Sequence, residues 1–81
     1  MFNLIIDIGN TNTKLAVFEG RELRFFERYT TFNQADVDDV LLKFPIQKYS
    51  ISSVRSSVDE VLHFFPKHLQ YCPFHTGLHL G

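Results

Sequence analysis

The chain has 81 residues, which is enough for one domain with one hydrophobic core. Its hydrophobic content of 44% excludes a chain that is disordered throughout, and its formal net charge of −1 provides no basic surface for nucleic acid or membrane. Cys72 is the only cysteine, which excludes an internal disulfide and suits a reducing compartment. No apolar run approaches the ~20 residues of a transmembrane helix, and Asp7 interrupts the N-terminal apolar run too early for a signal peptide. We therefore expect a cytoplasmic protein.

The first 30 residues predict three β-strands joined by two turns. Leu4-Ile5-Ile6 is a short apolar run typical of a buried strand. A second strand, Thr13 to Phe18, pairs back on the first through a turn at residues 9–12. A Gly-containing connection at Gly20 leads to a third strand over residues 22–29. One face of that third strand is expected to carry Leu23, Phe25 and Tyr29.

Two amphipathic helices are predicted, each ending before a proline. The first covers residues 33–44, with Asn33 as N-cap, Asp36 three residues later and Pro45 as its stop. Asp38 and Asp39 lie near the positive end of its dipole, which explains them better than a calcium site. The second helix covers residues 57–65 and starts with a capping box from Ser57 to Glu60. The two apolar stripes are Val37, Val40, Leu41 and Phe44, then Val58, Val61, Leu62 and Phe65.

A strand is expected after each helix. Residues 49–54 form the first and end in Ser52 and Ser53, and residues 69–74 form a short second one that is limited by Pro73. Residues from His75 onward show no periodicity and are expected to be a loop. Three antiparallel strands followed by strand–helix–strand units predict an α/β fold with the helices packed on the sheet. We expect a single domain over residues 1–81.

The turn after the first strand has the composition of a phosphate site. Gly9, Asn10 and Asn12 tolerate positive φ, so that successive backbone N–H groups can converge on one anion. Thr11 and Thr13 add hydroxyl donors.

Charged residues lie at the two ends of the same turn. Lys14 adds a positive charge, and Asp7 can hold a magnesium ion or its water shell. The predicted phosphate-binding residues are Asp7, Ile8, Gly9, Asn10, Thr11, Asn12, Thr13 and Lys14, with the metal at Asp7.

Several other side chains have a structural explanation beside a functional one. Lys14 is also compatible with an ordinary solvated strand lysine, and Ser52 and Ser53 with hydroxyls that satisfy the strand end. Arg55 has the same ambiguity. His75 and His79 have a spacing that suits a metal only on a helix, and Gly77 between them argues against one. Cys72 is expected to be a buried thiol.

The octet from Asp7 to Lys14 resembles the first phosphate motif of the superfamily that contains acetate kinases, sugar kinases and actin. It is most similar to type III pantothenate kinases, whose chains open on an apolar strand followed by D-[IV]-G-N-T. The segment Ile51-Ser52-Ser53-Val54 resembles a second landmark of that family, although the proline that usually follows is replaced by Arg55-Ser56-Ser57. The G-x-D-R segment, which carries the substrate-binding Arg and the catalytic Asp in that family, does not occur up to Gly81. We therefore expect an N-terminal fragment without a catalytic residue of its own.

The resemblance implies a ribonuclease-H-like half-domain and, in a full-length protein, ATP-dependent phosphorylation of pantothenate to 4′-phosphopantothenate, the first step of coenzyme A biosynthesis. It also implies Mg²⁺, a monovalent cation (K⁺ or NH₄⁺) and a homodimer. Two alternatives remain open at this point. One is a non-enzymatic transcription accessory factor of the same family, and the other is a different small-molecule kinase of the superfamily, such as a sugar kinase.

Overall fold

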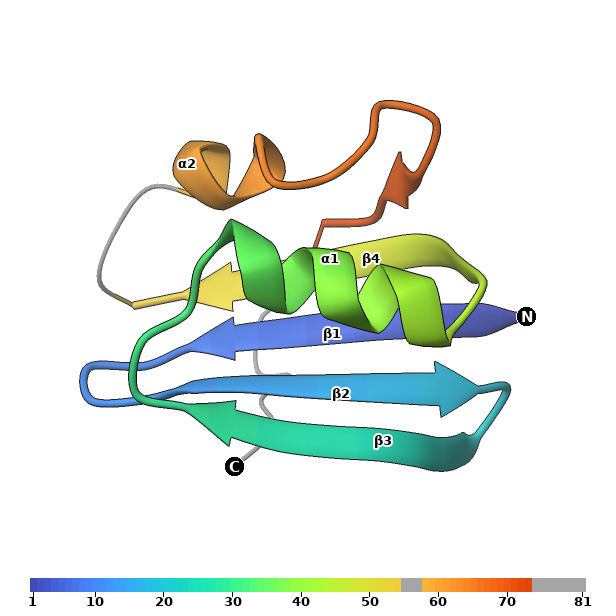
Figure 1. Ribbon diagram of the computed structural model, residues 1–81, viewed down its shortest axis with the longest axis horizontal. Coiled ribbons are helices and arrows are strands. Elements are labelled where there is room, and N and C mark those ends of the chain that lie inside the picture. The colour runs from blue at the N-terminus through green and yellow to red at the C-terminus, as the bar shows by residue number, and fades with distance from the viewer. Residues whose placement is uncertain (55–57, 74–81) are drawn as a thin grey trace.

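The computed structural model describes residues 1–54 and 58–73, which form one mixed sheet with two helices (Figure 1). The strand order is β3-β2-β1-β4-β5. The first three strands are antiparallel, β4 runs parallel to β1, and β5 runs parallel to β4. This architecture is consistent with the predicted ribonuclease-H-like half-domain, and the three antiparallel strands at its start are as predicted. The elements are β1 (Phe2–Ile8), β2 (Thr13–Glu19), β3 (Glu22–Tyr29), α1 (Gln34–Lys43), β4 (Ile46–Ser53), α2 (Val58–Leu62) and β5 (Gln70–Tyr71).

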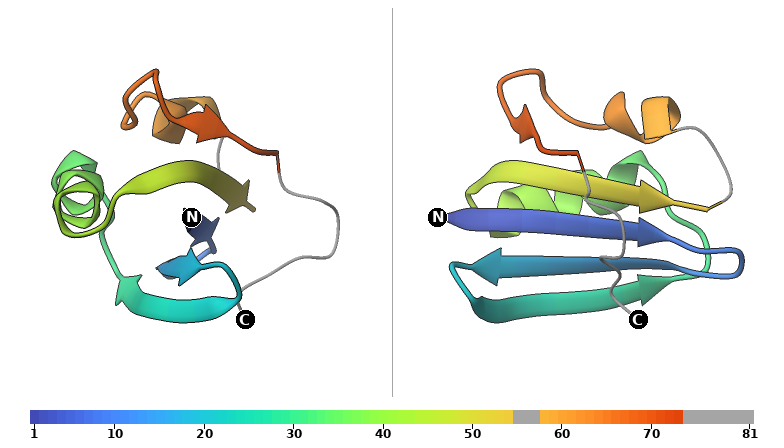
Figure 2. Two further views of the ribbon diagram at one scale, coloured as in Figure 1. Left: turned by 90° about the vertical axis from the view of Figure 1, so that its right-hand side faces the viewer. Right: turned by 180° about the vertical axis from the view of Figure 1, so that it is seen from behind.

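The two helices lie on the same side of the sheet (Figure 2), and the hydrophobic core is formed between them and the sheet. In β1, every second side chain is buried: Leu4, Ile6 and Ile8 are 0%, 0% and 3% exposed. Val37 and Val40 of α1 and Val61 of α2 join the same cluster. The expectation of a wholly buried first strand is therefore wrong in one respect, because Ile5 points to the opposite face and is only half-buried.

We call that opposite side of the sheet the second face. Side chains alternate along each strand, and directly paired residues of neighbouring strands point to the same side. The residues of the second face are Asn3, Ile5 and Asp7 of β1, Lys14, Ala16 and Phe18 of β2, Leu23, Phe26 and Arg28 of β3, Lys48, Ser50 and Ser52 of β4, and Gln70 of β5.

Helix α1 starts and ends as predicted. The Asn33 side chain accepts a hydrogen bond from the Ala35 amide (3.0 Å), and the Asp36 carboxylate accepts one from the Asn33 amide (2.9 Å), which completes a capping box. Phe44 is the C-cap, directly before Pro45. All four predicted stripe residues pack on the core, so this amphipathic helix is confirmed.

Helix α2 is shorter than predicted and ends at Leu62. The chain then tightens into i→i+3 turns, with the Phe64 amide bonded to the Val61 carbonyl (3.0 Å) and the Phe65 amide to the Leu62 carbonyl (3.2 Å). Phe65 still reaches the core, because its ring stacks on Tyr49 with centroids 3.9 Å apart. Pro66 is therefore not the stop of this helix, and the predicted cap at Ser57 lies outside the described residues.

The last two strands also differ from prediction. β4 begins at Ile46, three residues earlier than expected, because Ile46 already pairs with Phe2 at the start of β1. β5 contains only Gln70 and Tyr71 and is followed by a hydrogen bond from the Cys72 amide to the Tyr49 carbonyl (2.8 Å). Cys72 is half-buried and not buried as expected. Residues 74–81, with the end of the predicted last strand, His75 and His79, lie outside the described residues.

In β3 the expected face is wrong for one residue. The pairing between β2 and β3 shifts between Val17 and Phe18, so that Leu23 pairs with Phe18 while Phe25 pairs with Val17. Such a bulge reverses the alternation of side chains on one side of it. Leu23 is 52% exposed as a result, whereas Phe25 packs on the core.

The two hairpin loops use glycine for different reasons. Gly20, at the first position of a two-residue loop, has φ +60 and is the only described residue with positive φ. The turn therefore does not use the tolerance of Gly9, Asn10 and Asn12 for positive φ. The loop after β1 closes with a hydrogen bond from the Gly9 amide to the Asn12 carbonyl (2.9 Å), and a Cβ on Gly9 would lie 3.2 Å from that oxygen.

The core analysis predicts unequal effects of two matched leucine truncations. Leu15 is 0% exposed and Leu42 is 87% exposed. Leu15→Ala should lower the free energy of unfolding by about 2–5 kcal/mol through lost burial and a residual cavity, and Leu42→Ala should change it by less than about 0.5 kcal/mol. Urea denaturation followed by circular dichroism measures both. Ile51→Val, expected to cost about 0.5–1.5 kcal/mol, replaces Leu15→Ala if that variant does not fold. Equal losses for Leu15→Ala and Leu42→Ala would contradict this core.

The loop geometry predicts that Gly9→Ala distorts the turn. The new methyl group would press on the Asn12 carbonyl, so the free energy of unfolding should fall by about 1 kcal/mol and the backbone amide resonances of residues 9–12 should shift. Gly20→Ala is the control, because nothing lies within 4 Å of its Cβ position and its cost of about 1–2 kcal/mol comes from backbone strain alone. Unchanged turn resonances in Gly9→Ala would show that the close contact is absent.

Candidate functional site

Strand register brings four polar residues together, one from each of four neighbouring strands. Asp7 pairs with Ser52 on one side and with Lys14 on the other, and Lys14 pairs with Arg28. We call these four residues the polar row. They lie on the second face, at the end of the sheet where β1 enters its turn and β4 ends. Neighbouring strands are about 4.8 Å apart, so the row forms a continuous polar surface.

Asp7 is the acidic group of the polar row. Its side chain is half-buried, and within residues 1–54 and 58–73 its carboxylate has neither a hydrogen bond nor an ion pair. Losing water without gaining a partner is unfavourable for a carboxylate, so this position suits a group that binds a cation. The described residues contain no cluster of three or more His, Cys, Asp or Glu side chains for a metal. A single carboxylate fits Mg²⁺, which retains waters and takes further oxygen ligands from phosphate.

The turn beside Asp7 presents backbone donors. The Gly9 amide is used within the turn, whereas the amides of Asn10, Thr11 and Asn12 have no hydrogen-bond acceptor in the described part of the chain. Thr11 is exposed, and its hydroxyl oxygen accepts a hydrogen bond from the Asn12 side chain at 3.3 Å. Three successive amide groups without acceptors remain suited to an anion, although the chain reaches this arrangement without positive φ.

The structure separates the predicted octet into two sets of side chains. Asp7 and Lys14 belong to the second face, whereas Ile8 and Thr13 pair with each other on the core face and are 3% exposed each. The side chain of Thr13 is thus on the opposite side of the sheet from Asp7. Outside the core, the octet presents the Asp7 carboxylate, the Lys14 side chain, and the backbone and polar side chains of residues 10–12.

The two serines at the end of β4 are separated in the same way. Ser52 pairs with Asp7 and belongs to the polar row, whereas Ser53 pairs with Ile8 on the core face. The Val54 amide donates to the Ile8 carbonyl (3.0 Å), which continues the pairing and holds the end of β4 next to the turn. Of the two predicted candidates, only Ser52 adjoins Asp7. Arg55 lies outside the described residues.

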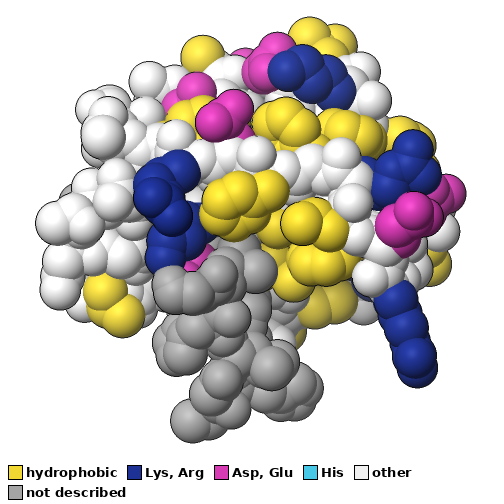
Figure 3. Space-filling view, turned by 90° about the horizontal axis from the view of Figure 1, so that it is seen from below, with side chains coloured by type: hydrophobic (Ala, Val, Ile, Leu, Met, Phe, Trp, Pro, Cys, Tyr) yellow, Lys and Arg dark blue, Asp and Glu magenta, His cyan; other side chains and the backbone are white. Residues whose placement is uncertain are grey.

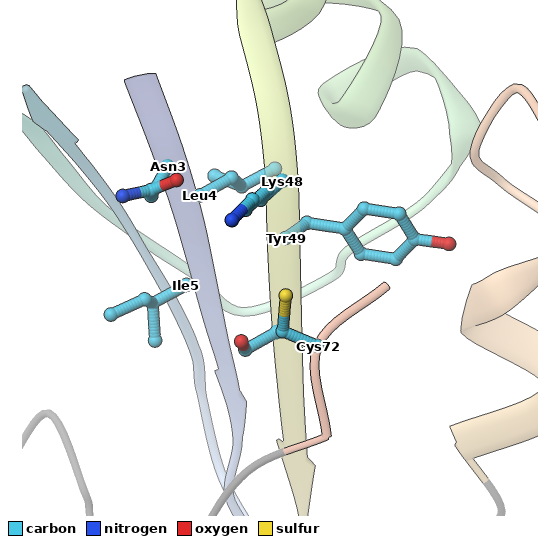
Figure 4. A pocket seen from close by; sticks show the side chains of 7 residues that line it. Asn3, Leu4, Ile5, Lys48, Tyr49 and Cys72 are labelled. Atoms are coloured by element: carbon cyan, nitrogen blue, oxygen red, sulfur yellow. The ribbon is translucent and has the colours of Figure 1, made fainter. Parts of the chain in front are cut away.

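A separate hollow of about 250 Å³ lies toward the other end of β1 (Figure 4). It is lined by Asn3, Leu4, Ile5, Lys48, Tyr49, Ser50 and Cys72. The Asn3 side-chain oxygen is buried and has no hydrogen-bond partner among the described residues. Asn3 precedes Asp7 by four residues, which is about 13 Å along a strand. Ile5 and Ser50 bring the hollow within two residues of Asp7 and Ser52 along their strands, although neither Asp7 nor Ser52 lines it.

Sequence reasoning missed Arg28 as a neighbour of the site. The sequence carried no local signal for this neighbour. The two-residue loop at residues 20–21 starts a register that would place Glu27 opposite Lys14. The bulge between Val17 and Phe18 shifts that register by one residue, so that Arg28 pairs with Lys14 instead. Figure 3 views the molecule from the β3 edge and shows Lys and Arg side chains on both sides of a group of hydrophobic ones.

Within the described ranges, no helix is long and apolar enough to cross a membrane.

The chain was compared with known proteins. The family model for type III pantothenate kinase matches residues 3–76, which include the turn, the polar row and the end of β4. A search of curated proteins found no match. Because the family model covers nearly all of the sequence, and the fold agrees with the half-domain expected from the octet, the chain belongs to the type III pantothenate kinase family.

Proposed function

We propose that this chain provides the phosphate- and metal-binding part of an enzyme that phosphorylates pantothenate to 4′-phosphopantothenate with ATP, in coenzyme A biosynthesis. The observation that carries the proposal is the half-buried Asp7 carboxylate, which has no partner within the described ranges and adjoins a turn with three available amides. Membership in a family of kinases supports the reaction class. The choice of pantothenate rests on the family alone.

The proposed mechanism is positioning combined with charge neutralisation. The amides of Asn10, Thr11 and Asn12 and the ammonium of Lys14 hold the phosphates, and Asp7 holds Mg²⁺ or its water shell. Bound magnesium would neutralise the charge that develops on the transferred phosphoryl group. Ser52, which pairs with Asp7 in the sheet, would orient a metal-bound water or the carboxylate in the loaded enzyme.

Other parts of the proposal come from the family resemblance. A catalytic Asp that activates the pantothenate hydroxyl, and an Arg that binds pantothenate, would come from outside residues 1–81. We also propose a monovalent cation (K⁺ or NH₄⁺), a homodimer and a cytoplasmic location. A protein of this family that instead acts as a transcription accessory factor, or on a sugar, would fail the assay for pantothenate phosphorylation.

The metal role predicts a large effect of Asp7→Asn in a longer protein that contains this chain and a G-x-D-R segment. Removing the charge that holds magnesium should lower kcat by at least about a hundredfold, since metal-ion stabilisation is worth several kcal/mol. Steady-state formation of 4′-phosphopantothenate and thermal melting measure turnover and folding on the same samples. Asp38→Asn, an exposed substitution on α1, is the control and should retain turnover. Near-normal kcat in Asp7→Asn would reduce Asp7 to a turn residue.

The 81-residue chain by itself is predicted to be inactive. It supplies one side of a nucleotide site and contains no G-x-D-R segment. Mixed with ATP, pantothenate, Mg²⁺ and K⁺, it should release no ADP above background, and calorimetry should detect no micromolar binding of ATP. Pantothenate-dependent ADP release by the purified chain would contradict this prediction and would require a catalytic residue within residues 1–81.

A further inference from the structure

Negative and positive charges do not alternate along the polar row. The row contains the hydroxyl of Ser52, the anion Asp7 and then two cations, Lys14 and Arg28, on adjacent strands. Along the row, a group suited to a metal cation, Asp7, is therefore followed by two groups suited to an anion, Lys14 and Arg28.

Arg28 differs from the other arginine of its strand. Arg24 makes an ion pair with Glu19 at 2.6 Å, so its charge is already matched. Arg28 is exposed and has no hydrogen bond or ion pair with any residue that the structure describes. Its neighbour Glu27 pairs with Leu15 on the core side of the sheet and so points away from the polar row. The guanidinium is thus available to a ligand on the second face.

The distances suit a ligand with several phosphate groups. Arg28 is one strand spacing from Lys14 and two from Asp7, which corresponds to about 5 Å and about 10 Å between the backbones. A single phosphate at the turn lies beside the two middle members of the row, Asp7 and Lys14, whereas a chain of phosphates is long enough to extend from there to Arg28. Arginine binds phosphate through two parallel N–H donors, and lysine acts as a point charge. Arg28 would therefore fix the orientation of a phosphate group, and Lys14 would add positive charge beside it.

We propose that Arg28 is an additional anion-binding residue, which acts with Lys14 to hold the phosphate group farthest from a metal at Asp7. The ligand class is a linear polyphosphate with bound Mg²⁺, as found in a nucleoside triphosphate. This inference rests on the proposed function, because it extends the same phosphate site by one strand. It assigns Arg28 a role in binding and orientation.

The test is an NMR titration of the ¹⁵N-labelled 81-residue chain with inorganic tripolyphosphate and Mg²⁺ at low ionic strength. Parallel titrations with inorganic phosphate and with ATP distinguish polyphosphate recognition from binding of any anion and from binding of the nucleoside. The variants are Arg28→Gln, Arg28→Lys and Lys14→Gln, and Arg24→Gln is the matched control on the same strand. Thermal melting without ligand is measured for each variant.

Arg28→Gln should weaken tripolyphosphate binding about tenfold, the size expected for loss of a charge-assisted hydrogen bond, and should leave binding of inorganic phosphate nearly unchanged. Arg28→Lys should restore part of the affinity, and Arg24→Gln should have less than a twofold effect. Without ligand, Arg28→Gln should melt at the same temperature, because Arg28 is exposed and has no hydrogen bond or ion pair with a described residue. A structural role for Arg28 would instead lower the melting temperature.

Two results overturn the inference, and they are distinguishable. If tripolyphosphate shifts the amides of residues 10–13 and Lys14→Gln weakens binding, but Arg28→Gln does not, the phosphate site stands and the role of Arg28 is wrong. If the unmodified chain shows no response at the turn to millimolar tripolyphosphate, the inference and the phosphate site of the proposed function both fail.

Discussion

The structure depends on the position of β1 in the middle of the sheet. Its pairing with β2 on one side and β4 on the other leaves no free backbone edge, and its even-numbered side chains Leu4, Ile6 and Ile8 are fully covered by the helices. This strand cannot slip by one residue without exposing those three side chains and burying Asp7 in the core. The same constraint that secures the core therefore holds the Asp7 carboxylate on the opposite face.

The one-sided packing of the helices explains why the candidate site forms where it does. Both helices contribute to one hydrophobic cluster, so the second face retains polar side chains at the end of the sheet where β1 turns. Because β1 and β4 are parallel, their C-terminal ends meet at that same end and bring Ser52 next to Asp7. Open α/β sheets commonly bind ligands beyond the carboxyl ends of parallel strands, and this arrangement follows that rule.

Local sequence signals were sufficient where one short-range interaction controls the structure. Helix α1 was predicted accurately because Asn33 and Asp36 form a capping box and Pro45 prevents continuation. Helix α2 was not, since its end depends on how Phe65 reaches Tyr49 across the core and not on the next proline. The bulge that exposes Leu23 also had no local signal, because the register of β3 is set by its pairing with β2.

The sequence by itself determined the strand–turn octet from Asp7 to Lys14, the type of each element, the order of the elements and the family. These features follow from residue types and spacings within one turn or one helix. Only the tertiary structure decided which members of the octet share a face, because that depends on strand pairing over the whole sheet. It placed Thr13 in the core, kept the turn free of positive φ, and brought Ser52 and Arg28 into line with Asp7 and Lys14. Residues 14 or more positions apart became neighbours through hydrogen-bond register, and no local pattern in the sequence encodes that register.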